Sequence, residues 1–193
     1  AIDSYNKAIA LQPYFPEVFN NLGNTLNSQG EHTEASQKYT RAIELKPDFA
    51  EAYNNRGVAL NELRQHAEAI QNFKKAIDLQ PNFVQAHSNI GNAHRAIGEF
   101  DAAVLNYNEA IRIDPRHSES YNNLGLVQKD LGLHDLAHQN YKKALALNPS
   151  KDEANYNIAT LYNFLCQYKD AIRHFNLTKL PDSQSQVLEV LYK

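Results

Sequence analysis

Residues Ser118–Lys151 read SESYNNLGLVQKDLGLHDLAHQNYKKALALNPSK, and the rest of the chain repeats this stretch with variations. The prolines at positions 13, 47, 81, 115 and 149 are 34 residues apart, and the glycines at 23, 57, 91 and 125 keep the same spacing. A fixed period of this length is typical of stacked supersecondary units and not of one globular core. The period therefore decides the fold class.

Each unit is predicted to be a pair of α-helices. In the first half of Ser118–Lys151 one helix face is formed, at i, i+3, i+4 and i+7, by Tyr121, Leu124, Gly125 and Gln128. A second stripe with helical spacing follows at Ala137, Tyr141 and Ala144. Gly132, between the two stripes, tolerates the left-handed backbone that ends a helix, and Pro149 stops the second helix.

The two helices of a unit are expected to pack closely against each other. Gly125 and Ala137 are small, and bulk at either position would hold the two backbones apart. Leu131, Leu145 and Leu147 lie outside this contact, so a single hairpin would leave them exposed. Only a neighbouring unit can bury such residues, which is why the repeat requires an array.

These residues resemble the tetratricopeptide repeat family, whose pattern has an aromatic residue at position 4, leucine at 7, glycine or alanine at 8, alanine at 20, an aromatic residue at 24, alanine at 27 and proline at 32. Five copies match in register, at 16–49, 50–83, 84–117, 118–151 and 152–185, the last one atypical. The resemblance implies an all-α, right-handed superhelical solenoid of antiparallel helix hairpins. The first helix of each hairpin would line the concave surface.

The two ends of the sequence are interpreted in the same register. Residues 1–15 match the second helix of a truncated repeat, so we expect a fragment of a longer protein. The apolar face around Ile2, Tyr5 and Ile9 would then lack its partner, and a second copy is expected to cover it, which makes a homo-oligomer possible. Residues 186–193 are the start of a capping helix or of a further repeat, and the sequence leaves both open.

Composition excludes several classes of protein. A net charge of −3 at pH 7 gives no electrostatic signal for nucleic acid binding, and no apolar run is long enough to span a membrane. The lone cysteine, Cys166, excludes an internal disulfide framework, and it lies at the turn between helices, where other copies carry Gly or Arg64. The expected compartment is intracellular and cytoplasmic.

No motif for catalysis is present, so the chain itself is predicted not to be an enzyme and to need no cofactor. His134 and His138 have the i, i+4 spacing of metal ligands, but no third ligand is evident, and a satisfied surface pair is favoured over a metal site. His87 and His94 lie on the packing stripe of the third repeat. They are either a pH-sensitive joint or, as the favoured interpretation, neutral imidazoles with hydrogen-bond partners.

Asparagines accumulate on the face of each first helix that lies opposite the packing stripe. Position 6 is asparagine in all five repeats, at Asn21, Asn55, Asn89, Asn123 and Asn157. Positions 5, 9 and 12 add Asn20, Asn54, Asn122, Asn24, Asn92, Asn27, Asn61 and Asn163. A primary amide can pair with any peptide backbone through its donor and acceptor together. Because packed helices lie roughly 8–10 Å apart, this row is predicted to grip an extended peptide about every third residue.

The charges beside the row indicate the kind of peptide. Position 2 is Glu17, Glu51, Gln85, Glu119 and Glu153, and the basic exceptions in the groove are Arg95 and Lys129 at position 12. A neutral or mildly basic extended segment is therefore the expected ligand. The resemblance to tetratricopeptide co-chaperones that clamp an acidic carboxylate fails here, because those proteins use basic residues near positions 2, 5 and 6.

Three hypotheses on function follow. The leading one is a non-catalytic scaffold that binds an extended peptide segment through the asparagine row, which is also similar to the asparagine ladder of O-linked N-acetylglucosamine transferases. The second is that the chain is the substrate-recognition arm of a larger enzyme such as a glycosyltransferase. The third is self-assembly through head-to-tail stacking of the repeat ends. Asparagine at position 6 can also be inherited by repeat duplication without a binding role.

Overall fold

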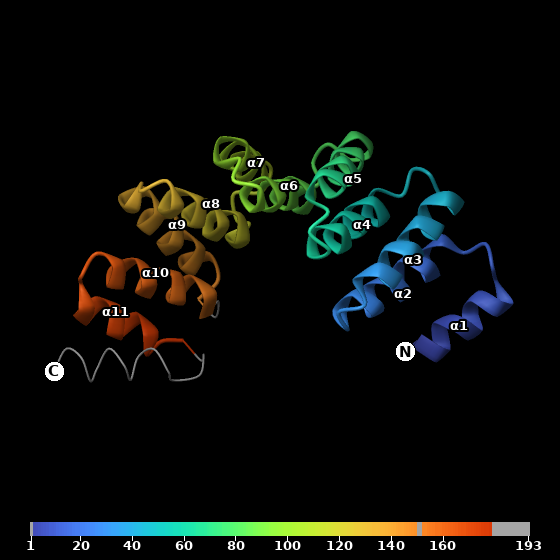
Figure 1. Cartoon of the computed structure of the whole chain (residues 1–193), viewed down its shortest axis with the longest axis horizontal. Coiled ribbons are helices and arrows are strands. Elements are labelled where there is room, and N and C mark those ends of the chain that lie inside the picture. The colour runs from blue at the N-terminus through green and yellow to red at the C-terminus, as the bar shows by residue number, and fades with distance from the viewer. Residues whose placement is uncertain (1, 150–151, 179–193) are drawn as a thin grey trace. The chain divides into compact units, whose positions relative to one another are not determined.

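The structure is a computed structural model that describes residues 2–149 and 152–178. Within these residues the chain is all α-helical (Figure 1). The helices are α1 (Ile2–Leu11), α2 (Pro16–Ser28), α3 (His32–Leu45), α4 (Ala50–Glu62), α5 (His66–Leu79), α6 (Val84–Ala96), α7 (Phe100–Ile113), α8 (Ser118–Asp130), α9 (His134–Leu147), α10 (Asp152–Phe164) and α11 (Tyr168–Phe175). The expected cap or further repeat at 186–193 lies outside the described residues.

The chain divides into two compact units, Ala1–Asn106 and Tyr107–Lys193, and α7 contains the boundary between them. In the first unit α2 pairs with α3 and α4 with α5, and each pair forms a hairpin (Figure 1). In the second unit α8 pairs with α9 and α10 with α11. The predicted fold class of helix hairpins repeating every 34 residues is confirmed. No described helix is both long and apolar enough to cross a membrane.

The turn inside each hairpin has the same geometry in all five repeats. The residue at position 15 takes a positive φ, and it is glycine in three repeats, at 84° for Gly30, 80° for Gly98 and 76° for Gly132. Its N–H bonds back three residues and the next N–H bonds back five, as in Gly30 to Asn27 and Glu31 to Leu26, which is the Schellman end of a helix. Arg64 and Cys166 fill this position at 60° and 58°, as the sequence predicted.

Replacing Arg64 or Cys166 by glycine is expected to stabilise the protein. A left-handed residue with a Cβ costs roughly 1–2 kcal/mol, whereas glycine's greater freedom in the unfolded chain returns about 0.4–1 kcal/mol of that. Arg64→Gly and Cys166→Gly should therefore each raise the unfolding free energy by up to about 1.6 kcal/mol. Urea denaturation measures the unfolding free energy of each variant. The reverse exchanges, Gly30→Ala and Gly132→Ala, should lower it. Unchanged or lower stability in both glycine variants would contradict the prediction.

The close helix approach expected at position 8 is present. A Cβ built on Gly57 would lie 2.5 Å from the Phe73 ring, and one on Gly125 would lie 2.6 Å from the Tyr141 ring and 3.1 Å from the Ala137 carbonyl oxygen. Gly23 meets the Tyr39 ring in the same way, at 2.6 Å. The rings themselves are buried, so they have little room to move away. Glycine therefore lets an aromatic ring of the second helix pack on the backbone of the first.

Gly57→Ala is expected to destabilise the protein although alanine is the better helix former by about 1 kcal/mol. The new methyl group would overlap the Phe73 ring, and overpacking of this kind costs about 1–3 kcal/mol. The fifth repeat carries the opposite residue, because Ala159 is buried there against Ala171 and Phe175. Ala159→Gly should destabilise as well, through lost burial and helix propensity. Thermal unfolding measures the stability of both variants. A Gly57→Ala protein as stable as wild type would show that the Phe73 ring can move aside to make room for the methyl group.

The face of α1 around Ile2, Tyr5 and Ile9 does not lie bare, so the expectation that it lacks a partner is wrong. These three residues pack against the cluster that contains Leu22, Leu26, Ala35 and Tyr39 of the following hairpin. The second helix of one repeat is thus covered by the first helix of the next. The three residues are only partly buried, and the coverage of the rest of this face by a second copy stays a prediction.

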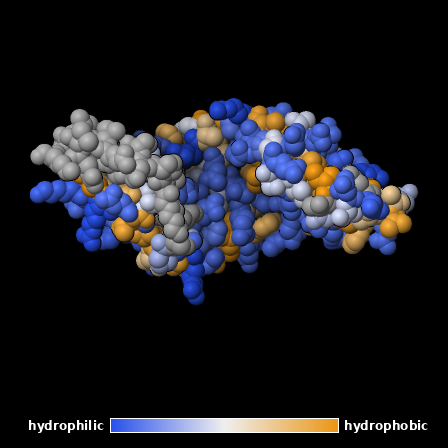
Figure 2. Space-filling model, turned by 90° about the horizontal axis from the view of Figure 1, so that it is seen from below, coloured by the Kyte–Doolittle hydropathy of each residue, from blue (hydrophilic) through white to orange (hydrophobic). Residues whose placement is uncertain are grey.

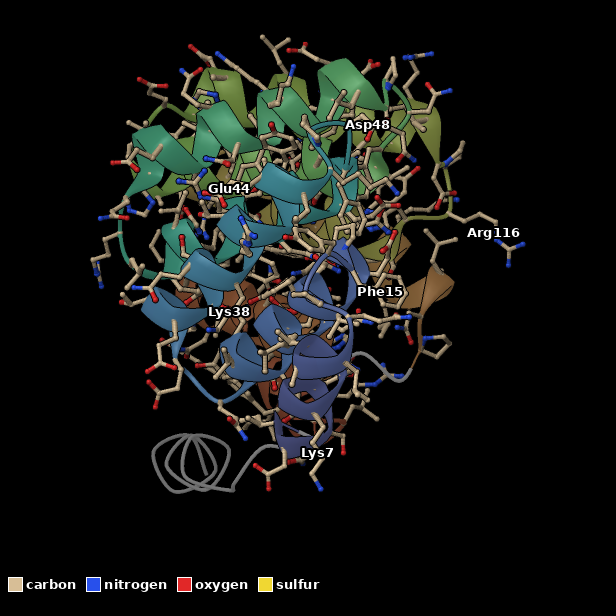
Figure 3. The ribbon with its side chains drawn as sticks, turned by 90° about the vertical axis from the view of Figure 1, so that its right-hand side faces the viewer. Lys7, Phe15, Lys38, Glu44, Asp48 and Arg116 are labelled. Atoms are coloured by element: carbon tan, nitrogen blue, oxygen red, sulfur yellow. The ribbon has the colours of Figure 1, made fainter. Side chains whose placement is uncertain are left out.

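Apolar residues next to α1 remain exposed instead. Phe15, labelled in Figure 3, lies just before α2 and is 44% exposed, while Phe49 at the same repeat position is 9% exposed. Phe49 is covered because it packs with Phe19, Ala42 and Ala52. Farther along, Leu145 packs against the next repeat as expected, whereas Leu131 stays 41% exposed. Burial by neighbours is therefore extensive without being complete.

Candidate functional site

The first helices of successive repeats lie in contact with one another inside each unit. In the first unit α2 contacts α4 and α4 contacts α6, and in the second unit α8 contacts α10. These contacts bring the asparagines of neighbouring repeats together. The candidate site is, in each unit separately, the face formed by its first helices, which we call the first-helix face.

In the first unit the amides of this face form a continuous hydrogen-bond chain across three repeats. Asn89 Nδ2 donates to Asn54 Oδ1 at 3.0 Å, and Asn54 Nδ2 donates to Asn55 Oδ1 at 3.3 Å. Asn55 Nδ2 then donates to the Oδ1 atoms of Asn20 and Asn24, both at 3.1 Å. Both N–H groups of Asn55 are thereby used inside the protein.

The second unit repeats the arrangement. Asn157 Nδ2 donates to Asn122 Oδ1 at 2.9 Å, and Asn122 Nδ2 is shared between Asn123 Oδ1 at 3.4 Å and Glu153 Oε1 at 3.1 Å. In both units position 6 of one repeat donates to position 5 of the repeat before it. In the sequence, this hydrogen bond between repeats corresponds to the pair of asparagines at positions 5 and 6. Both asparagines of the pair were predicted to line the groove.

The position-5 asparagines do not line an open groove, and that expectation is wrong. Asn20, Asn54 and Asn122 are only 7%, 6% and 0% exposed, because they lie under the next repeat and accept its hydrogen bond. Asn123 and Asn157 are also buried. Asn55 and Asn89 are half-buried, and Asn21 is exposed and its side chain has no hydrogen-bond partner in the part of the chain that the structure describes. The row therefore presents fewer amides to a ligand than its letters suggest.

Three asparagines at positions 9 and 12, Asn24, Asn27 and Asn61, also have partners inside the protein, whereas Asn163 is exposed. Asn24 Oδ1 accepts a hydrogen bond from the buried Tyr39 hydroxyl at 2.8 Å, and burial raises the pKa of Tyr39 to about 12. Asn27 and Asn61 bond the Nδ1 atoms of His32 and His66, the first residues of the next helices, at 2.7 and 2.8 Å. Asn24 and Asn27 thus fix α2 to α3, and Asn61 fixes α4 to α5.

The remaining polar residues predicted for the face are partly engaged as well. Lys129 Nζ lies 3.8 Å from Asp130 Oδ1. Asn92 and Arg95 are half-buried and interact with other groups of the chain. Glu17 accepts from Lys46 at 3.3 Å. Glu51 and Glu119, by contrast, are exposed and have no cation within ion-pair distance among the described residues. Hydrophilic side chains cover much of the surface in Figure 2.

The histidines that the sequence singled out have partners too. His87 is 9% exposed and its Nε2 donates to the Pro81 carbonyl at 3.0 Å, while His94 Nδ1 lies 2.6 Å from Glu99 Oε2. Both imidazoles thus have the hydrogen-bond partners that the favoured interpretation expected, and their charge stays a prediction. His138 Nε2 shares a hydrogen bond of 2.9 Å with the Tyr162 hydroxyl, and within the described ranges no three His, Cys, Asp or Glu residues cluster as metal ligands would.

The amide chain is expected to couple neighbouring repeats energetically. Asn54→Ala should destabilise by about 1–3 kcal/mol, because the Asn89 donor is left without its acceptor near the interface. A double-mutant cycle on Asn54 and Asn89 should give a coupling of about 0.5–1.5 kcal/mol. Denaturant unfolding of the four proteins measures it, and Asn54 with Asn27, which share no bond, is the control pair. Equal coupling in both pairs would mean that the amide contact contributes nothing specific.

Comparison with known proteins gives consistent matches along the chain. A family model described as a TPR repeat matches residues 23–64 and 91–132, and models described as a tetratricopeptide repeat match 50–83 and 118–151, and 4–37. Among curated protein sequences no match is found.

Several solved structures share the fold at low sequence identity. The anaphase-promoting complex assembly Cut9–Hcn1 matches with a TM-score of 0.86 and 17% identity, over 100% of this chain and 39% of that one. PilF of Pseudomonas aeruginosa matches with a TM-score of 0.80 and 20% identity, over 91% and 82%. YrrB, described as a TPR protein with an unusual peptide-binding site, matches with 0.65 and 20%, over 99% and 100%. At these identities the likeness shows the fold alone.

Proposed function

Because the chain belongs to the tetratricopeptide repeat family, we propose that it is a non-catalytic scaffold that binds an extended peptide segment on its first-helix face. The observation that carries the proposal is the half-buried, hydrogen-bonded row of Asn55 and Asn89 beside the exposed Asn21. Its side chains are held in place before a ligand arrives, which lowers the ordering cost of binding. The description of YrrB as peptide-binding agrees with this direction.

The hydrogen bonds inside the row decide which atoms a peptide can use. Asn55 has both N–H groups committed, so it offers an oxygen lone pair to a peptide N–H. Asn89 has one N–H committed, which leaves its other N–H and its oxygen, and Asn21 offers its whole amide. The face is therefore richer in acceptors than in donors. Such a row grips main-chain groups of any sequence and discriminates weakly.

Selectivity would come from charge. The exposed carboxylates of Glu51 and Glu119 have no cation beside them in the described chain, and they favour a neutral or mildly basic segment over an acidic one. Each such carboxylate also complements the N-terminal end of its helix, so it is retained for two reasons. Like charges facing each other across an interface reject wrong partners more than opposite charges add affinity.

The test is selection from a displayed library of random dodecapeptides, followed by affinity measurement on the full chain. Selected peptides should be neutral or basic, and Asn21→Ala/Asn55→Ala/Asn89→Ala should weaken their binding by about tenfold or more, since each lost hydrogen bond is worth about 0.5–1.5 kcal/mol. The control is Asn72→Ala/Asn108→Ala, which removes two asparagines of second helices. Peptides that are acidic, or that bind the triple variant as well as wild type, would refute the proposal.

A further inference from the structure

A second pocket lies in the second unit, away from the first-helix face. The helices α9 and α11 flank α10 there, and the space between them is an open pocket of about 500 Å³. Its apolar lining comes from Leu145, Ile158 and Leu177. Its polar lining comes from His138, Lys142, Tyr162, Asp170, Arg173 and His174. Apolar walls with a few convergent polar groups are the usual make-up of a small-ligand site.

The positive groups of this pocket outnumber the negative ones. Lys142 and Arg173 are exposed and have no carboxylate within ion-pair distance in the described chain, and Asp170 is the one acidic side chain in the lining. Both imidazoles stand beside these cations. Burial, helped by Lys142 for His138 and by Arg173 for His174, lowers the pKa of each, against the weaker opposite effects of Asp135 and Asp170. The pocket is short of negative charge.

The hydrogen bonds of the two imidazoles leave one nitrogen of each ring, Nδ1 of His138 and Nε2 of His174, without a partner among the described residues. His138 Nε2 shares a hydrogen bond with the Tyr162 hydroxyl. His174 Nδ1 donates to Asn155 Oδ1 at 3.2 Å, and its Nε2 has no partner among the described residues. A protonated His174 would therefore add an N–H at Nε2 to the donors of Lys142 and Arg173.

The pocket two repeats earlier provides a comparison inside the same chain. It has a similar size, about 520 Å³, and Lys74 and Ile90 occupy the places of Lys142 and Ile158. Asn106, however, stands where the later pocket has His174, and Leu105 stands in the sequence register of Arg173. Asp78 adds a carboxylate where the later pocket has Ala146. The earlier pocket is also lined by two cations, Lys74 and Lys75, beside Asp78. What distinguishes the later pocket is therefore the pair of Arg173 and His174 on α11.

We propose that the pocket lined by Lys142, Arg173 and His174 is a second ligand site that takes a phosphate group carried on an apolar body. Phosphate fits better than a single carboxylate, because it brings about −1.5 to −2 charges and three acceptor oxygens to two cations and an imidazole. Leu145, Ile158 and Leu177 would cover the apolar body. The site is independent of peptide binding on the first-helix face, so either proposal can fail alone.

The test is an NMR titration of the histidine ring signals of the full chain with phenyl phosphate, at constant ionic strength and without other phosphate. A bound dianion beside His138 and His174 favours their charged forms, so both pKa values should rise by about one unit. His66, which bonds Asn61 in the first unit, serves as reference and should not respond. An equal shift of all histidines would mean general charge screening and would overturn the site.

Variants separate the contribution of each group. Arg173→Leu, the residue found in register at Leu105, should abolish the histidine response and weaken binding about tenfold or more, whereas Arg173→Lys should keep both. Lys74→Leu in the earlier pocket is the matched control and should change nothing. If phenyl phosphate binds no more tightly than inorganic phosphate, the apolar body is wrong. A phosphotyrosyl peptide that binds more tightly than phenyl phosphate would identify a phosphorylated protein as the source, and equal binding a small ester.

Discussion

An aromatic ring of the second helix lies directly on a glycine of the first helix in the α2–α3, α4–α5 and α8–α9 hairpins, which depend on this contact. At Gly23, Gly57 and Gly125 the ring atoms come so near that no side chain fits. Two helices held this closely present a fixed angle to the next pair, which in turn fixes which side chains of neighbouring first helices meet. The amide bonds that link α2, α4 and α6 are possible because this close contact sets the geometry of the α2–α3 and α4–α5 hairpins.

Much of the hairpin structure could be predicted from the sequence. The 34-residue period, the turn residues and the small residues at the helix contact each reflect a requirement of a single hairpin. The glycine period predicted the close helix contact, and Arg64 and Cys166 were recognised as turn residues from their register alone. These features need only one hairpin to be understood. The same holds for His87, whose place on the packing stripe predicted a buried ring with a partner.

What the sequence did not predict is the direction in which the asparagines point. A helical wheel places Asn54 and Asn55 on the same general face, yet Asn54 is buried under the next repeat while Asn55 stays partly accessible. The difference depends on the rotation of one hairpin against the next, which a single repeat does not contain. For the same reason the prediction that the α1 face lacks a partner was wrong. Ile2, Tyr5 and Ile9 pack against α2 and α3, which belong to the next repeat. The pocket between α9 and α11 also arises only between repeats.

Asn55, Asn89 and Asn157, all at position 6, each donate a hydrogen bond to the asparagine at position 5 of the repeat before. Asn54 and Asn122 can receive such a bond, but the third and fifth repeats have Ser88 and Tyr156 at position 5. The repeats are therefore not interchangeable modules, although their backbones are alike. An array rebuilt by shuffling them would keep its hairpins and turns. Whether the hydrogen bonds between two neighbouring repeats could form would depend on the order of the repeats. The donors and acceptors on the first helices therefore specify which repeat can follow which.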